Sequence, residues 1–146
     1  PPRRRRRAAP GARVTVPNGT RAGAPGDGAR DVYVGLMSGT STDGVSAAAV
    51  RFAPRAGAAS GPYAPLDFEL VGFTQVAYAP AQRERLLAAM ERGTARDYCR
   101  LSVDLGGWLA DAAAALLAEA GIARADVRAV ASHGQTLWHE PGHSTW

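Results

Sequence analysis

The stretch VYVGLMSGTSTDGVSAAAVRF, residues 32–52, places a turn of small polar residues between two apolar segments. Between Asp31 and Met37, the run at 32–37 is apolar and rich in strand formers, which predicts a buried β-strand. Residues 45–52 predict a second strand, joined antiparallel to the first by the turn at 38–44. Residues 66–79 alternate imperfectly between apolar and polar side chains and predict a third strand that extends this meander.

A helix is predicted to follow the third strand. Pro80 suits the first turn of a helix, where the N–H that it lacks has no partner in any case, and Gly93 ends the helix. Leu86, Leu87 and Met90 are expected on its buried side.

A second, longer helix is predicted, with a recognisable sequence signal at its start and another at its end. Thr94 and Asp97 have the spacing of a capping box, and Gly121 supplies a left-handed residue that ends the helix. Gly106 and Gly107 each cost about 1 kcal/mol relative to Ala within a helix, so we expect them to pack closely against a neighbouring backbone. The apolar residues that recur at helical spacing and should face the core are Leu101, Leu105, Trp108, Leu109, Ala112 and Leu116.

Residues 127–132 predict a buried strand that leads into a polar stretch at 133–136. Three strands, two helices and a further strand predict an α/β fold, with an antiparallel meander, a helical crossover and a parallel strand. Ligands of such sheets gather at the strand ends. We therefore expect the turn at 38–44 and the stretch at 133–136 to lie along one edge.

Charge divides the chain into two regions. Residues 1–30 hold eight arginines and one acidic residue, a net charge of +7, whereas residues 31–146 hold nine arginines and twelve acidic residues, a net charge of −3. The first region is predicted to be a disordered tail, because its Arg, Pro, Gly and Ala cannot bury enough apolar surface to offset conformational entropy. It is interpreted either as a tether to nucleic acid or anionic surfaces or, as we favour, as an extension typical of a GC-rich gene. Residues 31–146 are expected to form one lobe.

Composition indicates the cytoplasm. The arginine run at 3–7 is not followed by the roughly 7–15 apolar residues of a secretory signal, and no stretch approaches the roughly 20 apolar residues of a membrane span. Cys99 is the only cysteine, so no intrachain disulfide can form, which fits a reducing compartment. We expect no membrane partner.

The turn at 38–44 has the composition of a phosphate-binding loop. Glycines let backbone amides approach a polyanion, and Ser and Thr hydroxyls add donors to phosphate oxygens. Asp43 would repel phosphate unless a divalent cation bridges the two, directly or through water, and a Mg²⁺-nucleotide meets that condition. The alternative is an ordinary hairpin turn, in which Gly, Asp and Ser occur for backbone reasons alone. A Walker A loop is excluded, because the chain has no lysine.

Two long segments, VGLMSGTSTDGV at 34–45 and SHGQTLWHEP at 132–141, resemble signatures of the anhydro-N-acetylmuramic acid kinase family. The resemblance covers residues 31–146. It implies an incomplete actin-like (ribonuclease H-like) ATPase lobe, with ATP, Mg²⁺ and an amino sugar meeting between two lobes. The implied reaction opens the 1,6-anhydro ring of 1,6-anhydro-N-acetylmuramic acid with water and phosphorylates the 6-oxygen, giving N-acetylmuramic acid 6-phosphate in bacterial peptidoglycan recycling.

The resemblance also implies roles for individual residues. Thr42 stands where the family typically has a larger apolar residue, which alters packing. Ser46 stands where Asp is typical, which removes a carboxylate near the nucleotide, and Asp43 remains to hold Mg²⁺, directly or through water. The positions that match the family's ATP-phosphate loop are Gly39, Thr40, Ser41, Thr42, Asp43, Gly44, Val45 and Ser46.

His133, Gln135 and Thr136 match the signature that the family places in the sugar cleft. His133 either contacts the substrate or ties two strands together through its imidazole. The resemblance places the catalytic base beyond Trp146, so no catalytic residue is assigned in this chain. We expect residues 1–146 alone neither to turn over nor to bind ATP tightly, because a cleft with one wall cannot exclude water or orient the attacking group.

Two other catalytic patterns are rejected. Residues 139–143 (HEPGH) match the zinc-protease motif, which requires a helix that Pro141 and Gly142 oppose. A serine nucleophile at Ser38 or Ser41 lacks the Gly-x-Ser-x-Gly elbow.

A rival hypothesis is a non-catalytic nucleotide-binding module whose basic tail acts as a tether. The identity of the sugar rests on the resemblance alone, since no residue pattern distinguishes it from another hexose. ATP and an amino sugar are the expected partners, and a homodimer is an open option for the full-length protein. An isolated lobe is expected to expose apolar surface that a partner lobe would cover.

Overall fold

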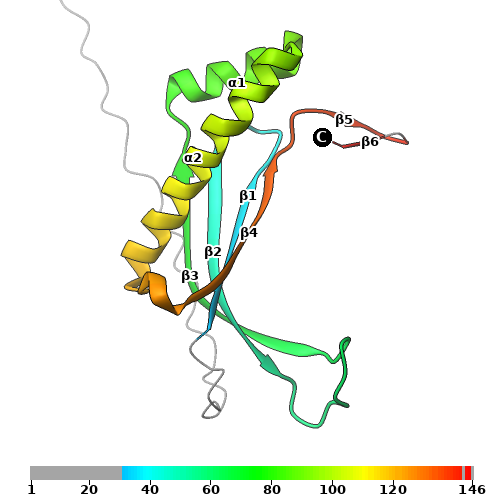
Figure 1. The fold of residues 1–146 in the computed structure, drawn as a ribbon, viewed down its shortest axis with the longest axis vertical. Helices are drawn as coiled ribbons and strands as arrows, with labels where there is room; N and C mark the ends of the chain where they lie inside the picture. Colours follow the sequence, from blue (N-terminus) through cyan, green and yellow to red (C-terminus); the bar gives the residue numbers. More distant parts are fainter. Residues whose placement is uncertain (1–30, 143, 146) are drawn as a thin grey trace, which may run out of the picture.

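The computed structural model describes residues 31–142, 144 and 145, so the predicted tail at 1–30 lies outside the described residues. Four strands form one sheet in the order β3-β2-β1-β4, the longer helix covers one of its faces, and the shorter helix lies beside one end of the longer one (Figure 1). A small hairpin and a single 3-10 turn complete the described chain. The elements are β1 (Val32–Ser38), β2 (Gly44–Pro54), β3 (Leu66–Ala77), α1 (Pro80–Arg92), α2 (Ala95–Ala120), η1 (Arg124–Asp126), β4 (Val127–Gln135), β5 (His139–Glu140) and β6 (Ser144–Thr145).

The inner strand β1 pairs with a sequence neighbour on one side and with a distant strand on the other. It runs antiparallel to β2, with Tyr33 opposite Val50, and parallel to β4, with Val34 opposite Val130. β2 runs antiparallel to β3. The predicted α/β fold, with its meander, crossover and parallel strand, is confirmed. Because β1 and β4 are parallel, their carboxyl ends meet at one edge of the sheet.

The core lies between the sheet and α2. Val32, Val34 and Leu36 alternate along β1 and are buried, as the two-residue period of a strand requires. Leu101 and Leu116 of α2 belong to the same cluster. The predicted stripe of α2 is confirmed, since its six positions are buried or packed against this cluster.

Small residues let α2 lie close to the sheet. Ala47 and Ala49 of β2 are fully buried. At Gly72 of β3, a Cβ atom would stand 2.9 Å from the Cβ of Ala120 and 3.4 Å from the Cδ1 of Leu116. Packing against the helix therefore explains the alanines at these two positions, although alanine is a weak strand former.

The prediction for α1 is right about its ends and wrong about part of its buried side. Pro80 is its first residue and Gly93 its C-cap, although Gly93 is extended (φ −62°, ψ 138°) and not left-handed. Leu86 is buried as predicted. Leu87 is 40% exposed, and Ala89 lies in the core where Leu87 was expected. The reason is helical spacing: Ala89 lies three residues from Leu86 on one face, whereas Leu87 is turned about 100° away.

The capping of α2 is as predicted. The Thr94 hydroxyl accepts a hydrogen bond from the Asp97 N–H, and the Asp97 carboxylate accepts one from the Thr94 N–H. Hydrogen bonds from the hydroxyl and the N–H of Thr94 lower the pKa of the Asp97 carboxyl. Gly121 ends the helix with φ +64°.

The prediction for the glycines within α2 is wrong. No atom lies within 4 Å of the position that a Cβ would take at Gly106 or Gly107, so neither packs against a neighbouring backbone. By length and composition, α2 is also apolar enough to cross a membrane, with a mean hydropathy of 1.4, which the sequence prediction missed. Core helices of soluble proteins meet the same criterion, and α2 buries Leu101, Ala112 and Leu116 against this protein's own sheet.

The strand β4 is not buried as predicted. Most of its residues are exposed, and Val130 is 55% exposed. The cause is position, because β4 is an edge strand with β1 as its one neighbour in the described sheet.

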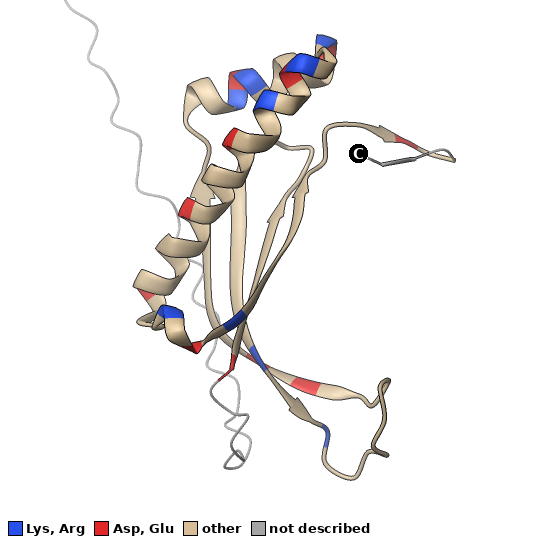
Figure 2. Cartoon of the chain, viewed as in Figure 1, with Lys and Arg blue, Asp and Glu red and all other residues tan. Residues whose placement is uncertain are grey.

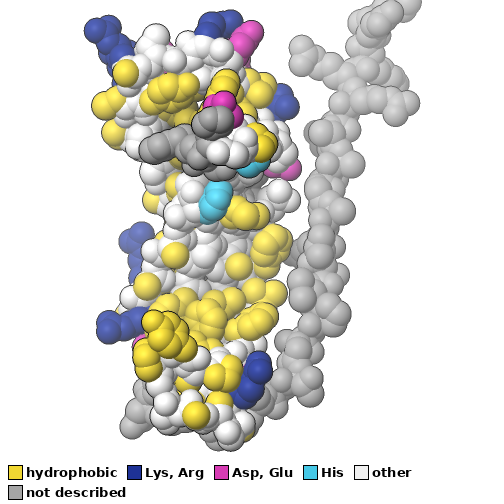
Figure 3. All heavy atoms as spheres, turned by 90° about the vertical axis from the view of Figure 1, so that its right-hand side faces the viewer, with side chains coloured by type: hydrophobic (Ala, Val, Ile, Leu, Met, Phe, Trp, Pro, Cys, Tyr) yellow, Lys and Arg dark blue, Asp and Glu magenta, His cyan; other side chains and the backbone are white. Residues whose placement is uncertain are grey.

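The sheet face opposite the helices is open and apolar. Tyr33, Gly35 and Met37 alternate with the buried residues of β1 and point to this face. Figure 3 shows hydrophobic side chains gathered on the side of the molecule turned away from α1 and α2. The prediction that the lobe exposes apolar surface is thus matched by large exposed side chains at Met37, Phe52, Phe68, Leu70 and Phe73.

Charged residues of both signs are interspersed along the helices (Figure 2). Arg85 of α1 forms an ion pair with Asp104 of α2, and so joins the two helices at their surface. Arg92 pairs with its neighbour Glu91. Exposed pairs of this kind contribute little stability, so the helices are held mainly by their apolar faces.

Replacing Leu116 with Ala should lower the free energy of unfolding by about 2–4 kcal/mol, because it leaves a cavity beneath α2. Leu87→Ala removes the same atoms from a partly exposed site and should cost less than about 1 kcal/mol. Urea unfolding followed by tryptophan fluorescence measures both. Equal losses for the two variants would contradict the assignment of the buried face.

Candidate functional site

The candidate site is the turn between β1 and β2, which we call the β1–β2 turn and define as residues 39–43. The N–H of Thr42 donates to the carbonyl of Gly39 at 3.1 Å and closes a four-residue β-turn. The N–H of Tyr78, just before α1, donates to the carbonyl of Asp43 at 3.1 Å. The turn is thus fixed at its beginning and at its end.

Three backbone N–H groups of the β1–β2 turn are left without a partner by the described part of the chain. Those of Thr40, Ser41 and Asp43 have no hydrogen-bond acceptor among residues 31–142, and all three residues are exposed. Successive free N–H groups in a turn form a concavity that attracts anions. The predicted phosphate-binding loop therefore has donors available to a ligand.

Gly39, the first residue of the turn, and Gly44, directly after the turn, have different roles. At Gly44 a Cβ would stand 2.3 Å from the carbonyl oxygen of Val76, so close approach of β3 requires glycine there. At Gly39 the nearest atom to a Cβ would be the Ser41 Oγ at 3.9 Å, and its φ is not positive. Neither packing nor conformation requires glycine at position 39, which leaves open space above its backbone for a ligand.

Thr42 is the strained residue of the turn. It has φ +50°, which is unusual for a β-branched residue, and it is 1% exposed. Its hydroxyl donates to the carbonyl of Ser41 at 2.8 Å. Its side chain therefore faces the interior, consistent with the prediction that the family departure at this position concerns packing. Strained backbone of this kind is concentrated at functional sites.

Asp43 offers the carboxylate at the surface of the turn. The hydroxyl of Ser41 donates to its Oδ1 at 2.9 Å, which holds the carboxylate in place. Among the residues whose side chains the structure describes, no group of three or more His, Cys, Asp or Glu could hold a metal ion. Mg²⁺ does not need such a group, because it commonly binds one carboxylate together with phosphate oxygens and water. Ser46, which the resemblance assigns to the phosphate loop, lies on β2. It is paired with Met37 of β1 on one side and with Gln75 of β3 on the other.

A buried polar cluster lies directly beneath the turn and consists of Ser38, Tyr78 and Gln135. The Tyr78 hydroxyl donates to the Ser38 Oγ at 2.9 Å. The Ser38 hydroxyl has one proton and two acceptors, the Gln135 Oε1 at 2.6 Å and the Gly44 carbonyl at 2.9 Å. Burial raises the pKa of the Tyr78 hydroxyl, as does the nearby Asp43 carboxylate, while the Ser38 hydrogen bond lowers it. The net shift is upward, so Tyr78 is a neutral donor at neutral pH.

The three residues predicted for the sugar cleft differ in orientation. Gln135 is 7% exposed, and its Nε2 donates to the carbonyls of Gly39 at 2.7 Å and Thr136 at 3.0 Å. Its carboxamide is therefore occupied by the chain itself. His133 is exposed and its imidazole makes no hydrogen bond or ion pair with the rest of the described chain, so no contact supports the alternative of an imidazole tying strands together. Thr136 is half-buried beside it.

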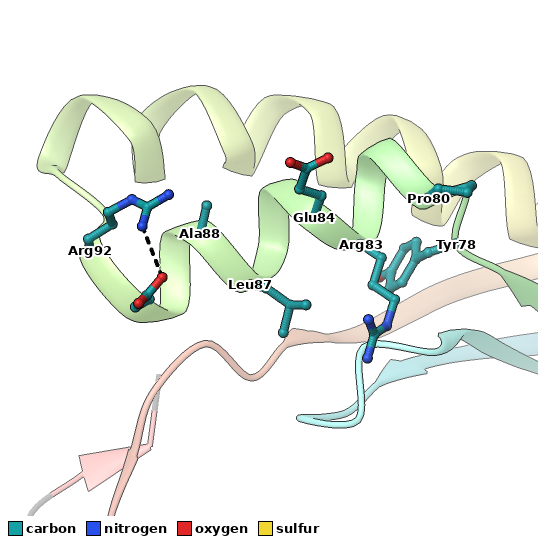
Figure 4. A pocket seen from close by; sticks show the side chains of 8 residues that line it. Tyr78, Pro80, Arg83, Glu84, Leu87, Ala88 and Arg92 are labelled. Atoms are coloured by element: carbon teal, nitrogen blue, oxygen red, sulfur yellow. Dashed lines mark hydrogen bonds and ion pairs between the residues drawn. The ribbon is translucent and has the colours of Figure 1, made fainter.

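A hollow of about 590 Å³ lies along α1 and shares Tyr78 with this cluster (Figure 4). In Figure 4, Arg83 and Leu87 extend to one side of α1 and Glu84 to another. Arg92 is engaged by Glu91, whereas Arg83 has no ion pair with any residue that the structure describes. The residues that line the hollow are Tyr78, Pro80, Arg83, Glu84, Leu87, Ala88, Glu91 and Arg92.

The zinc-protease motif is not helical, as predicted. His139 and Glu140 form β5 and pair with β6, and His143 lies outside the described residues. Sequence analysis missed Tyr78, which it treated as the end of a strand. The available signal was a Tyr two residues before the Pro80 that begins a helix, and that signal does not show what the hydroxyl contacts.

Comparison with known proteins yields one family. The family described as anhydro-N-acetylmuramic acid kinase matches residues 31–146. A protein of that name from Xanthomonas campestris pv. campestris (strain 8004) is 42% identical over 113 residues, covering 75% of this chain and 28% of the relative. Proteins of the same name from Picosynechococcus sp. and Caldanaerobacter subterraneus subsp. tengcongensis are 37% and 33% identical, covering 74% and 75% of this chain and 26% of each relative. The chain thus spans less than a third of the length of these relatives.

Gly44→Ala should lower the free energy of unfolding by more than about 2 kcal/mol, because the added methyl group collides with the backbone of β3. Gly39→Ala has room and should leave stability unchanged or raise it by up to about 1 kcal/mol. Thermal and urea unfolding of the two variants test this contrast. A Gly39→Ala variant as unstable as Gly44→Ala would contradict the open space seen above Gly39.

Proposed function

Because this chain belongs to the anhydro-N-acetylmuramic acid kinase family, we propose that it forms the nucleotide-phosphate side of an ATP-dependent sugar kinase. The proposed substrate is 1,6-anhydro-N-acetylmuramic acid. Water adds to the anomeric carbon, the bond from that carbon to the 6-oxygen breaks, and the 6-oxygen takes the terminal phosphoryl group of ATP. The products are N-acetylmuramic acid 6-phosphate, ADP and a proton, in bacterial peptidoglycan recycling.

The observation that carries the proposal is that the N–H groups of Thr40, Ser41 and Asp43, three exposed residues of one short turn, have no acceptor among residues 31–142. Phosphoryl transfer places negative charge on phosphate oxygens, and fixed backbone donors stabilise it without reorganisation. Open space above Gly39 lets a phosphate come within hydrogen-bond distance of this backbone. Free N–H groups at the two central residues also occur in an ordinary β-turn, so the glycine at position 39, which neither packing nor backbone conformation requires, is what favours a ligand site.

The site residues also fit a Mg²⁺-nucleotide. Mg²⁺ would neutralise phosphate charge when bound, and Asp43 is the exposed carboxylate able to hold it directly or through water. Ser41 keeps that carboxylate on the ligand side of the turn. Ser46 supplies no second carboxylate, so the proposed metal affinity depends on Asp43. Val45 is buried and acts through packing.

His133 and Thr136 are proposed to meet the amino sugar. They lie at the carboxyl end of β4, which is beside the carboxyl end of β1 because Ser38 is paired with Gln135. The 6-oxygen of the sugar, which receives the phosphoryl group, would therefore stand at the edge of the sheet that also presents the turn. Gln135 belongs to this edge, but its carboxamide faces the turn.

The relatives extend beyond the part that this chain covers, and we propose that the catalytic base and the second wall of the cleft correspond to that uncovered part. These 146 residues alone are accordingly proposed to be inactive and to bind ATP weakly, in the cytoplasm and without a membrane or nucleic-acid partner. A homodimer of the full-length protein belongs to the same proposal. The rival hypothesis of a tethered, non-catalytic module rests on residues 1–30, outside the described part of the chain.

Gly39→Ala should weaken binding of Mg²⁺-ATP about 10-fold or more, because the methyl group occupies the space that a phosphate needs. Gly35→Ala is the matched control, since Gly35 lies four residues earlier on β1 and also has no atom within 4 Å of the place that an added methyl group would take. Amide NMR titration of the chain with Mg²⁺-ATP measures even weak affinities. Equal affinities for the two variants, or no response of the Thr40 and Ser41 amides in the wild type, would count against the proposal.

Asp43→Asn should abolish most of the Mg²⁺ dependence of ATP binding while leaving metal-free binding unchanged or slightly stronger, because it removes both a metal ligand and a negative charge. Asp111→Asn, on the exposed side of α2, is the control for loss of one charge. The titration is repeated with and without Mg²⁺. An unchanged Mg²⁺ dependence in Asp43→Asn would rule out the metal role of this residue.

A further inference from the structure

The buried cluster of Ser38, Tyr78 and Gln135 touches the β1–β2 turn through carbonyl groups only. Gln135 Nε2 donates to the Gly39 carbonyl, and the Tyr78 N–H donates to the Asp43 carbonyl. The carbonyls at the two ends of the turn are therefore both bonded to this cluster. Neither contact uses an N–H group of the turn.

The peptide plane links each of these carbonyls to an N–H group. In a trans peptide unit the C=O of one residue and the N–H of the next point in opposite directions. The Gly39 carbonyl accepts from Gln135 Nε2 at 2.7 Å and from the Thr42 N–H at 3.1 Å, so the Thr40 N–H, which has no acceptor among residues 31–142, points away from both donors. The contact that holds the Gly39 carbonyl therefore also leaves the Thr40 N–H available to a ligand.

The orientation of the Gln135 carboxamide is itself fixed by its surroundings. Its Nε2 faces two carbonyls, Gly39 and Thr136, which can only accept hydrogen bonds. Its Oε1 faces two hydroxyls, Ser38 at 2.6 Å and Tyr78 at 3.4 Å, which can donate. A carboxamide rotated by half a turn would place oxygen against oxygen on one side, so only one orientation satisfies all partners.

We propose that Tyr78 is a positioning residue for nucleotide binding: its hydroxyl, through Ser38 and Gln135, holds the Gly39–Thr40 peptide so that the Thr40 N–H faces the phosphate. This proposal rests on the proposed function of the turn and adds to it a residue from the junction of β3 and α1. Tyr78 need not contact the nucleotide. Its ring is held independently against Trp108, with the ring centroids 5.7 Å apart at an interplanar angle of 65°.

Tyr78→Phe is the test, because it removes the hydroxyl and keeps the ring contact with Trp108. The Thr40 amide resonance of the free chain should shift and broaden, and the affinity for Mg²⁺-ATP should fall about 3–10-fold, as expected for one hydrogen bond acting through others. Tyr98→Phe is the matched control, since the Tyr98 hydroxyl donates to the Ala89 carbonyl at 3.0 Å, away from the turn. It should lose comparable stability and change neither the Thr40 resonance nor the affinity.

Gln135→Glu gives a second, stronger perturbation, because a carboxylate has no N–H to offer Gly39. Its affinity for Mg²⁺-ATP should fall by more than Tyr78→Phe lowers it, in proportion to the disturbance at Thr40. If Tyr78→Phe leaves the Thr40 resonance and the affinity as in the wild type, Tyr78 has no positioning role. If Tyr78→Phe disturbs the Thr40 resonance but the wild type shows no response to Mg²⁺-ATP, the hydrogen-bond chain holds the turn and the nucleotide function fails.

Discussion

The hydrogen bond from the Gln135 carboxamide to the carbonyl of Gly39 joins two parts of the chain that are 96 residues apart. Much else in the structure serves to make that contact possible. β4 must lie parallel to β1 for the side chain to arrive at the right end of the sheet, and α1 and α2 provide the crossover that brings it there. Buried polar groups must be paired, so the contact constrains the turn as firmly as the core constrains the strands.

Two kinds of interaction, apolar packing and directional hydrogen bonds, therefore determine the structure of this edge of the sheet. Apolar packing between β1, β2 and α2 determines where the strands lie, and it tolerates modest shifts because it has no direction. The polar cluster beneath the turn is directional and determines how individual peptide units are oriented. A turn made of glycine and small hydroxyl residues has little side-chain packing of its own, apart from the buried Thr42, so its shape depends on the second kind.

The elements that sequence analysis predicts correctly are those with local signals. The capping box at Thr94, the left-handed Gly121 and the period of α2 are all read within a few residues, and the strands follow from short apolar runs. What it misses depends on distant neighbours: the exposure of Val130 follows from the place of β4 at the sheet edge, and the inward-facing role of Gln135 follows from where Gly39 lies. Tyr78 is the clearest case, because only the folded chain brings its hydroxyl to Ser38.

The parallel pairing of β1 with β4 also orders events in time. β1 and β2 are adjacent in sequence and can pair as soon as both have left the ribosome, but Gln135 is made much later, several seconds afterward at about 5–20 residues per second. Closing so long a loop also costs more entropy than forming a hairpin. The hairpin consequently exists first as a nascent element with a loosely defined tip. Its tip acquires a single shape only when the distal strand docks, so maturation of the ligand-facing backbone is a late step of folding.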